Sequence, residues 1–551
     1  MRLGIDFGTT RTLAALVDRG NYPVIGVEDA LGDPHEHIPT VVAIDGERLV
    51  CGWDALAAPG ARARSFKRLL AAADATAATP VPIGDAVRPL GEVLAAFAAH
   101  VVAQLRGHPL VREREAAGDG ELEAVVGVPA NAGSAQRLLT LDAFARVGVH
   151  VLALVNEPSA AAFEYSHRHA RTLNSRRTDV VVYDLGGGTF DASLVRIDGA
   201  EHEVRATSGD PHLGGDDFDE RLVELALAAE ASGATAAGGA SGAGAGDACA
   251  ASAAGAGDAT RASDPSAGER LTDALPAAER AELLEQARVA KERLTPQTRR
   301  LLLERGDDDV IVPAADFYAA VTPLVERTIA VMAPSMAAVG AAADHLSDSD
   351  IAGIYLVGGA SALPLVPRLL RERFGRRVHR SPYPAASTAI GLAIAADANS
   401  DYWLRDRSSR GIGVFREREG GRAVAFDVLV EAGDAVAGAT VTREYRAAHN
   451  VGWFRFVEFT RTAAEPAADP GAAEPAASDP ADIGNLTTLA EVVVPFTAAL
   501  AEADKETLTT TPVTRSDDGP LVREEIAIDA NGVVTITHSI PALGVRTTST
   551  N

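Results

Sequence analysis

The order of hydrophobic and polar residues divides the chain into two kinds of region. Residues 1–230 alternate short apolar runs with segments of helical periodicity, and this alternation resumes over 279–397. Within 88–105, apolar residues recur three and four positions apart, which predicts one buried face of a helix. From about residue 410, short runs alternate apolar and polar positions, which indicates strands. The pattern predicts an α/β region followed by an all-β domain.

Two low-complexity segments interrupt these regions. Residues 231–268 are mostly Ala, Gly, Ser and Asp, and residues 464–482 are rich in Pro, Ala and acidic residues. Neither segment has enough bulky apolar side chains to offset chain entropy, so both are predicted to be disordered insertions. The predicted boundaries are an α/β domain over 1–397, a linker over 398–412 and an all-β domain over 413–551.

Composition narrows the classes of partner. The chain has 551 residues, too many for one hydrophobic core, and a formal net charge of −25. This charge disfavours nucleic acid and anionic membranes as partners. The two cysteines, Cys51 and Cys249, cannot form a disulfide framework, and we find neither a signal peptide nor an apolar run that could span a bilayer. We therefore expect a cytoplasmic protein.

One short motif occurs twice in the α/β region. The stretch "GIDFGTT" at 4–10 runs from an apolar strand into a carboxylate, a glycine and two threonines, and "VVVYDLGGGTFDASL" at 180–194 repeats that order. The two sets are Asp6, Gly8, Thr9 and Thr10, and Asp184, Gly186, Gly187, Gly188 and Thr189. A single copy is typical of an ordinary turn. The recurrence favours a pair of phosphate-binding hairpins.

The chemistry of these residues suits a polyphosphate. Glycine lets the backbone approach closely, so that amide groups and a hydroxyl point at an oxyanion from each hairpin. Asp6 and Asp184 suit Mg²⁺, which keeps several waters and needs few direct protein ligands. A third glycine turn, Gly358-Gly359 in "IYLVGGAS", ends a strand and opens a helix. Beside the other two, it is a candidate nucleoside cradle.

At this point the chain resembles the heat-shock protein 70 (DnaK-type) chaperones of the actin-like ATPase superfamily. The resemblance covers residues 3–397 apart from the first insertion. The matching segments, in order, are "GIDFGTT", "FKRLL" at 66–70, "VGVPANAGSAQR" at 126–137, "VNEPSAAAFEY" at 155–165, "DLGGGTFD" at 184–191, "HLGGDDFDERLV" at 212–223 and "YLVGGAS". The resemblance implies two duplicated α/β lobes followed by a smaller peptide-binding β-sandwich. It is weaker in the β-sandwich, and no segment matches the family's helical lid.

The resemblance also implies a role for each matching residue. The residues that it implies contact ATP or ADP are Gly8, Thr9, Thr10, Gly186, Gly187, Gly188, Gly214, Gly215, Lys291, Thr295, Gly358 and Gly359. The catalytic set is Lys67, Asp6, Glu157, Asp184 and Thr189. Lys67 matches the lysine that positions the attacking water, and Asp6 and Asp184 match the carboxylates that hold Mg²⁺ through water. Glu157 matches a sensor of nucleotide state, and Pro129 and Arg137 match the switch that relays this state outward.

The scarcity of lysine supports the assignment of Lys67. Of 51 basic Lys and Arg residues, only Lys67, Lys291 and Lys505 are lysine. A basic residue on a helix is more often simply solvated. Here, however, both lysine positions of the family keep lysine in a chain that otherwise uses arginine, and a compact ammonium is not interchangeable with a planar guanidinium.

Several positions depart from the family. Glu292 stands opposite the adenine-stacking arginine, Ala362 replaces another arginine, and Ala385 replaces an acidic residue. The adenosine pocket is therefore predicted to lose polar contacts and selectivity for the base. The acidic, Leu-rich linker is replaced by "SDYWLRDRSSRGIG" at 400–413. Since this linker offers few apolar side chains, we expect weak coupling between the domains.

These observations predict a DnaK-like chaperone that hydrolyses Mg-ATP and binds unfolded or extended polypeptide. A co-chaperone or nucleotide-exchange partner is possible. One alternative is a nucleotide-gated binding scaffold with little turnover. Another is a small-molecule kinase of the same superfamily, although a kinase needs neither the proline-switch segment nor the β domain.

Overall fold

The structure of the chain is a computed structural model that leaves several segments undescribed. It describes residues 1–72, 75–130, 132–169, 177–231, 275–306, 308–337, 351–400, 402–405, 410–418, 421–431, 438–461, 483–516 and 518–550. The predicted insertion at 231–268, apart from residue 231, and the one at 464–482 lie outside these residues. The chain forms two compact units. The larger is made of 1–215, 326–362 and 366–551, and the smaller of 216–325 and 363–365.

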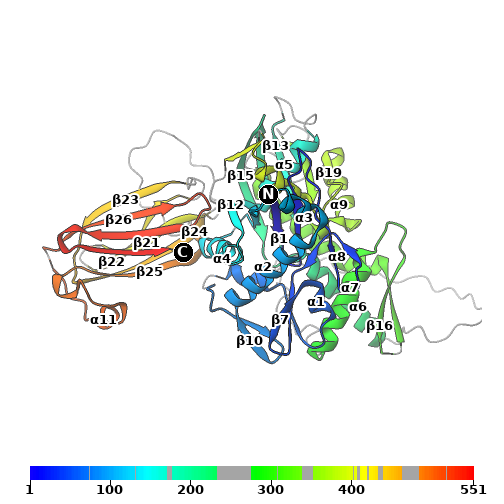
Figure 1. Cartoon of the computed structure of the whole chain (residues 1–551), viewed down its shortest axis with the longest axis horizontal. Coiled ribbons are helices and arrows are strands. Elements are labelled where there is room, and N and C mark those ends of the chain that lie inside the picture. The colour runs from blue at the N-terminus through cyan, green and yellow to red at the C-terminus, as the bar shows by residue number, and fades with distance from the viewer. Residues whose placement is uncertain are drawn as a thin grey trace, which may run out of the picture. The chain divides into compact units, whose positions relative to one another are not determined.

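The first sheet of the larger unit contains the first glycine hairpin (Figure 1). Its strand order is β12 (His150–Asn156), β11 (Glu123–Val128), β1 (Arg2–Phe7), β2 (Arg11–Leu16) and β5 (Ile38–Pro39). Strands β1 and β2 pair antiparallel, whereas β1 and β11 pair parallel. Leu3 and Ile5 are fully buried, as expected for a central strand that is covered on its faces.

The second sheet repeats this topology around the second hairpin. Its order is β19 (Val378–Arg380), β18 (Ile351–Val357), β13 (Asp179–Leu185), β14 (Phe190–Asp198), β15 (Glu201–Asp210) and β20 (Trp403–Arg405). Again the first hairpin strand, β13, pairs antiparallel with β14 and parallel with β18, and β14 pairs antiparallel with β15. The motif that occurs twice in the sequence thus occupies equivalent places in two sheets of like topology, which is the duplicated α/β architecture that the sequence predicts.

Helices follow the strands, as the alternating pattern predicts. Their bounds are α1 (Gly52–Ala57), α2 (Leu90–Gly107), α3 (Pro109–Ala116), α4 (Ser134–Ala145), α5 (Glu157–His169), α6 (Gly215–Ala231), α7 (Ala277–Glu292), α8 (Ala314–Ala337), α9 (Leu365–Phe374), α10 (Ser387–Ala396) and α11 (Lys505–Thr510). The buried face of α2 is the one expected from its periodicity, with Leu90, Val93, Phe97 and Val101 each at most 1% exposed. No described helix is long and apolar enough to cross a membrane.

Short strands complete the two units. The larger unit carries β3 (Val27–Glu28), β4 (Pro34–His35), β6 (Val41–Asp45), β7 (Arg48–Cys51), β8 (Arg62–Arg64), β9 (Pro80–Ile83) and β10 (Ala86–Pro89), and the smaller unit carries the antiparallel pair β16 (Arg300–Arg305) and β17 (Asp308–Pro313). The stretch "YPVIGVED" at 22–29 is predicted as a strand, yet only Val27 and Glu28 pair as one. Its other residues, including the proline at its second position, make at most isolated bridges.

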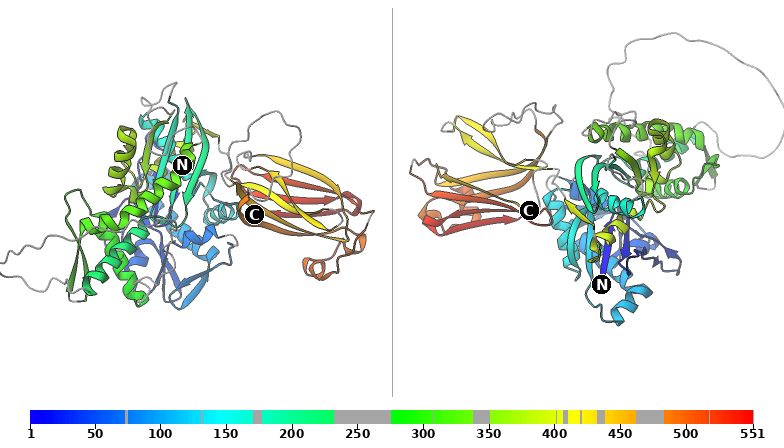
Figure 2. Two further views of the ribbon diagram at one scale, coloured as in Figure 1. Left: turned by 180° about the vertical axis from the view of Figure 1, so that it is seen from behind. Right: turned by 90° about the horizontal axis from the view of Figure 1, so that it is seen from above.

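The all-β domain is a sandwich of two four-stranded sheets. One has the order β22 (Ala423–Val430), β21 (Gly411–Arg418), β24 (Val451–Arg461) and β25 (Ile483–Pro495), and the other β23 (Thr440–Arg446), β26 (Leu521–Ile528), β27 (Val534–Ile540) and β28 (Val545–Thr550). Val414 and Phe456 of the first sheet share one core with Val522 and Ile536 of the second, so the sheets pack face to face (Figure 2).

One predicted turn differs in the structure. The Asn531-Gly532 pair predicts a two-residue hairpin between β26 and β27, but the connection is longer. Asp529 accepts hydrogen bonds from the backbone amides of Asn531 and Val533 with one carboxylate oxygen, each at 2.8 Å. Only Gly532 takes a positive φ, of 76°. The aspartate side chain therefore stabilises a wider loop, and Asn531 lies at its tip.

Candidate nucleotide site

The tips of the two glycine hairpins face each other within the larger unit. A Cβ atom added to Gly187 would lie 2.2 Å from Thr10 Oγ1, and one added to Gly188 would lie 2.8 Å from Thr9 Cγ2. Only glycine fits at such distances from a neighbouring side chain. The duplicated motif therefore brings two backbone loops and two threonine hydroxyls to one place, although they are almost 180 residues apart in the chain.

Two further glycine turns border the second hairpin. A Cβ on Gly214 would lie 2.6 Å from the carbonyl oxygen of Gly187, and one on Gly358 would lie 2.4 Å from Asp184 Oδ1. Gly358 also has a φ of 82°, a left-handed conformation that a side chain would strain. Gly359 follows it and begins a short 3₁₀ turn. Four of the predicted glycine segments thus meet at the second hairpin.

Hydrogen bonds fix the conformation of the second hairpin. The amide of Gly186 donates to the carbonyl of Thr189 at 3.0 Å, and the amide of Gly215 donates to the carbonyl of Gly186 at 3.0 Å. The Arg68 guanidinium donates to the carbonyl of Gly188 at 2.5 Å. These three hydrogen bonds engage the carbonyls of Gly186, Gly188 and Thr189 and so hold the loop in one conformation.

Lys67 reaches the end of the first hairpin strand from a different segment. It lies on a 3₁₀ turn, Phe66–Ala71, which follows Ser65 in a left-handed conformation with φ 51°. The side chain is 3% exposed, and its ammonium donates to the carbonyl of Phe7, the last residue of β1. It also forms an ion pair with Glu157 Oε1 at 3.0 Å. This lysine is therefore buried, not solvated.

Burial and mutual repulsion raise the pKa values of the carboxylates around Lys67. Desolvation, followed by repulsion from Glu157, raises the pKa of Asp6 well above its usual range, against an opposing effect of Lys67. The pKa of Asp184 is raised by the same desolvation and by repulsion from Glu157, Asp6 and Asp191. Burial and Glu157 also raise the pKa of Asp191, to about 7. The site concentrates negative charge where it is poorly solvated.

This excess of carboxylates fits a divalent cation. The carboxylates of Asp6, Asp184, Asp191 and Glu157 share one electrostatic environment. Within it, Lys67 lowers the pKa of each of the three aspartates. Among the described residues, no group of three His, Cys, Asp or Glu side chains is arranged to hold a metal directly. Mg²⁺ accounts for both the cluster of carboxylates and the lack of a direct three-ligand site, because it keeps most of its waters, binds phosphate oxygens and needs only one or two carboxylates.

A hydrogen-bonded path leads from Glu157 toward the β-sandwich. Asn156, its neighbour, accepts from Arg137 Nη2 at 2.8 Å, and Arg137 Nη1 donates to the carbonyl of Asn531 at 3.1 Å. The Asn531 side chain in turn accepts from the amide of Leu154 at 2.9 Å. The tip of the β26–β27 loop therefore contacts the strand that ends beside the candidate site.

A second contact lies at the start of helix α4. The amide of Ser134 donates to Glu458 Oε1 at 3.0 Å, and the Ser134 hydroxyl accepts from the amide of Val534 at 2.9 Å. Ser134 is 1% exposed and Glu458 is 7% exposed. Burial raises the pKa of Glu458, opposed by Arg410, whose guanidinium lies 3.7 Å away. Ser134 and Arg137 of the segment at 126–137, together with Leu154, thus contact the sandwich.

Two predicted site residues, Lys291 and Thr295, lie in the smaller unit. Lys291 is on α7, and its ammonium forms an ion pair with Asp219 at 2.6 Å. Thr295 follows the helix and exchanges a hydrogen bond with Thr298 at 3.0 Å. Burial raises the pKa of Asp219 to about 6, although Lys291 lowers it. The nucleotide-binding role of Lys291 and Thr295 stays a prediction.

Sequence reasoning missed two residues of the site. Asp191 pairs with Asp184 across the hairpin and is 8% exposed, and Arg68 holds the Gly188 carbonyl. Both stand inside motifs that were recognised, "DLGGGTFD" and "FKRLL". The signal for Asp191 was its place on the same strand pair as Asp184, where opposite residues of an antiparallel hairpin share a face.

Comparison with known proteins agrees with this geometry. The family model described as "Hsp70 protein" matches residues 98–234 and 278–405. The chain is 34% identical over 417 residues to the Chaperone protein HscA homolog of Variovorax paradoxus (strain S110), which covers 72% of this chain and 58% of the relative. It is 32% identical over 417 residues to the HscA homolog of Bordetella pertussis (strain Tohama I / ATCC BAA-589 / NCTC 13251), with the same coverage.

The chain therefore spans less than two thirds of the length of these relatives. The matched segments contain the second hairpin, Glu157 and the Gly358 turn, and the first hairpin with Lys67 packs against them. The family match, the similarity to the HscA homologs and the duplicated glycine hairpins agree, and the chain belongs to the Hsp70 family.

Proposed function

We propose that this protein is a DnaK-like chaperone of the cytoplasm that binds and hydrolyses Mg-ATP and binds extended polypeptide through its β-sandwich. One observation supports the binding and hydrolysis of Mg-ATP above all. Thr10 lies against Gly187, beside a buried lysine and several buried carboxylates. Two glycine loops that face each other suit the two sides of a polyphosphate chain.

The proposed chemistry is positioning and electrostatic stabilisation, as phosphoryl transfer requires. The amides of Gly8–Thr10 and Gly187–Thr189 bind the phosphate oxygens, and the threonine hydroxyls orient them. Lys67 donates to the charge that develops on the γ-phosphoryl oxygens and orients the attacking water. Its ion pair with Glu157 and its hydrogen bond to Phe7 hold the ammonium at the strand end before the substrate binds.

Mg²⁺ would be held by Asp6 and Asp184 through water, and when bound it would neutralise charge on the phosphates. Asp191, opposite Asp184 on the hairpin, adds a further buried carboxylate that repels Asp184 until a cation binds. Without a cation, burial raises the pKa values of these groups, so binding of Mg²⁺ requires them to lose protons.

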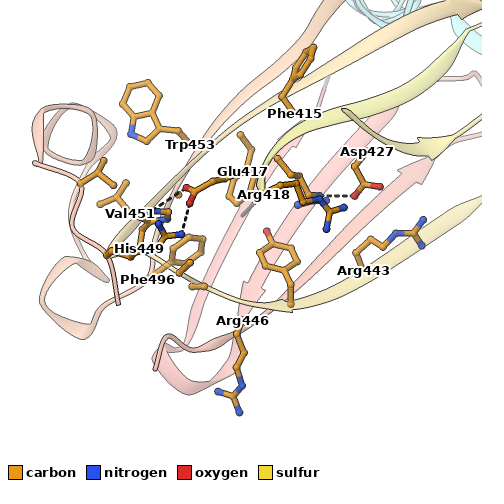
Figure 3. A pocket seen from close by; sticks show the side chains of 18 of the residues that line it. Phe415, Glu417, Arg418, Asp427, Arg443, Arg446, His449, Val451, Trp453 and Phe496 are labelled. Atoms are coloured by element: carbon orange, nitrogen blue, oxygen red, sulfur yellow. Dashed lines mark hydrogen bonds and ion pairs between the residues drawn. The ribbon is translucent and has the colours of Figure 1, made fainter. Parts of the chain in front are cut away.

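The second part of the proposal concerns a pocket of about 830 Å³ in the β-sandwich (Figure 3). We call it the sandwich groove, and it is lined by residues of strands β21 to β24, by 447–449, and by Phe496, Val513 and Arg515. Tyr445, Phe454 and Phe496 provide aromatic surface. The ring centroid of Phe454 lies 6.1 Å from that of Tyr445 and 6.3 Å from that of Phe496. An aromatic surface between strands suits apolar side chains of an extended segment.

Calorimetric titration with ATP and ADP, followed by single-turnover hydrolysis on the same sample, tests the nucleotide proposal. We expect Mg²⁺-dependent binding of both nucleotides and release of phosphate from ATP. Binding without hydrolysis would instead favour a nucleotide-gated scaffold. Hydrolysis that depends on an added sugar would favour a small-molecule kinase, and absence of binding would refute the proposal.

A further inference from the structure

Arginine side chains from both sheets of the sandwich face into the sandwich groove. Val414, Arg416 and Arg418 alternate along β21, so they share one face, and Val414 is fully buried in the core between the sheets. Arg443 and Tyr445 likewise share a face of β23, and Tyr445 packs against the same core. The groove therefore has basic residues on its two opposing walls.

Two of the three carboxylates that line the groove, Glu417 and Asp427, are paired, whereas Glu444 alternates with Arg443 and Tyr445 along β23, so its side chain points to the other face of that sheet. Glu417 binds Arg515 and lies 3.3 Å from His449 Nε2. Asp427 accepts a hydrogen bond from Arg416 Nε at 2.7 Å (Figure 3). These ion pairs neutralise Glu417 and Asp427, so neither is available to balance the remaining arginines.

Arg416 is further held from below by a buried acid. Its Nη2 atom donates to Glu524 at 2.5 Å, and Glu524, fully buried, also lies 3.1 Å from His538 Nε2. The Arg416 guanidinium stacks 5.0 Å from the ring centroid of Tyr445. This network fixes Arg416 as part of the floor of the groove, where it is not free to bind a ligand carboxylate.

Arg418 and Arg443 differ from Arg416. In the part of the chain that the structure describes, neither guanidinium group makes a hydrogen bond or an ion pair, and both residues are exposed. They come from different sheets and line the same groove (Figure 3). Two guanidinium groups that have no carboxylate partner among the described residues, in a groove that aromatic rings also line, form a recognition surface for carboxylates that flank an apolar side chain.

We propose that the sandwich groove selects extended polypeptide segments in which acidic residues flank an apolar or aromatic residue. The proposal rests on the polypeptide binding proposed above and specifies the class of segment bound. The chain's net charge of −25 does not oppose it, because exposed charges more than about 8 Å away are screened at physiological ionic strength. Arg418 and Arg443 therefore decide the local potential.

Fluorescence anisotropy with the full chain tests this specificity. Three labelled peptides share one apolar centre and carry acidic, neutral or basic flanks. We expect the acidic peptide to bind most tightly, and Arg418→Gln and Arg443→Gln each to weaken it by about threefold to tenfold. The neutral peptide should change little. The double reversal Arg418→Glu with Arg443→Glu should turn the preference toward the basic peptide.

The matched control is Arg455→Gln, which removes one positive charge from the same domain. Arg455 lies outside the groove and pairs with Glu491 at 2.7 Å. If Arg455→Gln weakens the acidic peptide as much as Arg418→Gln does, the effect is one of net charge and the proposal is wrong. Equal affinity for acidic and neutral peptides overturns the charge selectivity but leaves polypeptide binding intact. No binding of any peptide overturns both, and equal competition by single-stranded DNA overturns the assignment to polypeptide.

Discussion

Lys67 has two roles that one double-mutant cycle separates. Its ammonium is the partner of Glu157 at 3.0 Å, and it is proposed to act on the transferring phosphoryl group. We consider Lys67→Met, Glu157→Gln and the double variant. Methionine keeps the length and apolar stem of lysine and removes the charge, whereas glutamine keeps the shape of glutamate.

The expected cost of Lys67→Met follows from the distance and the burial. At 3.0 Å and an effective dielectric of about 20, the pair interacts with about 5 kcal/mol. Removal of one partner of a buried pair costs about 3 to 5 kcal/mol, because the other charge stays desolvated. Glu157 also repels Asp6, Asp184 and Asp191, so its charge without Lys67 is more costly still.

The double variant removes both charges and should recover most of this stability. A remaining loss of about 1 kcal/mol is expected from the carbonyl of Phe7, which loses its ammonium donor. Turnover should not recover. A group that stabilises developing charge contributes about 10²-fold to 10³-fold, and the double variant lacks it as the single variant does.

Thermal unfolding without nucleotide and single-turnover hydrolysis with saturating Mg-ATP give the two readouts. Stability should be lowest in Lys67→Met and near parental in the double variant. Hydrolysis should be slow in both. If hydrolysis recovers together with stability in the double variant, Lys67 acts only by holding the fold, and its catalytic assignment is wrong. Parental turnover in Lys67→Met would lead to the same conclusion.

Three further predictions follow from the site. Gly187→Ala should abolish nucleotide binding by forcing Thr10 away. Gly353→Ala, whose Cβ would lie 2.8 Å from the carbonyl oxygen of Arg377 just before β19, should lower stability and spare binding, and calorimetry and thermal unfolding measure the two effects. Asp191 has a pKa of about 7 in the folded state against 3.8 in the unfolded state, so the folded state binds more protons between these pH values. The free energy of unfolding without Mg²⁺ should therefore fall by about 4 kcal/mol as the pH rises from 4 past 7. Mg-ADP should reduce this fall, as measured by thermal unfolding. Since Glu292 replaces a base-stacking arginine in the resembled family, GTP should compete with labelled ATP at similar concentrations, and a preference of several orders of magnitude for ATP would contradict this.

The sequence was sufficient to predict the two hairpins but not their surroundings. Strand, glycine and carboxylate follow one another within seven residues, so the motif at Asp6 and its repeat at Asp184 are local signals. Their topological equivalence in two sheets was predictable because a repeated sequence builds a repeated fold. The ion-pair partner of Lys67 could not be predicted, because Glu157 is 90 residues away in the chain and the contact depends on where α5 begins.

The long-range polar contacts were the least predictable part of the fold. Arg68 binds a carbonyl 120 residues away, and Asn531 accepts from an amide 377 residues away. No periodicity encodes such pairs, because each depends on the packing of elements distant in the sequence. The unexpected length of the loop at 529–533 has a local cause, the hydrogen bonds of the Asp529 carboxylate. The prediction from the Asn531-Gly532 pair alone did not take Asp529 into account.

The contact of Asn531 changes the argument about coupling between the domains. The expectation of weak coupling assumed that the linker at 398–412 must carry it, and that a segment with few apolar side chains cannot. The structure places four hydrogen bonds elsewhere, made by Arg137, Leu154 and Ser134 with the sandwich. At a net 0.5 to 1.5 kcal/mol each, they sum to about 2 to 6 kcal/mol, and reversal of a two-state population needs about 5.5 kcal/mol. The linker composition therefore sets no upper limit on coupling, because these four hydrogen bonds to the sandwich together offer a polar route of comparable strength.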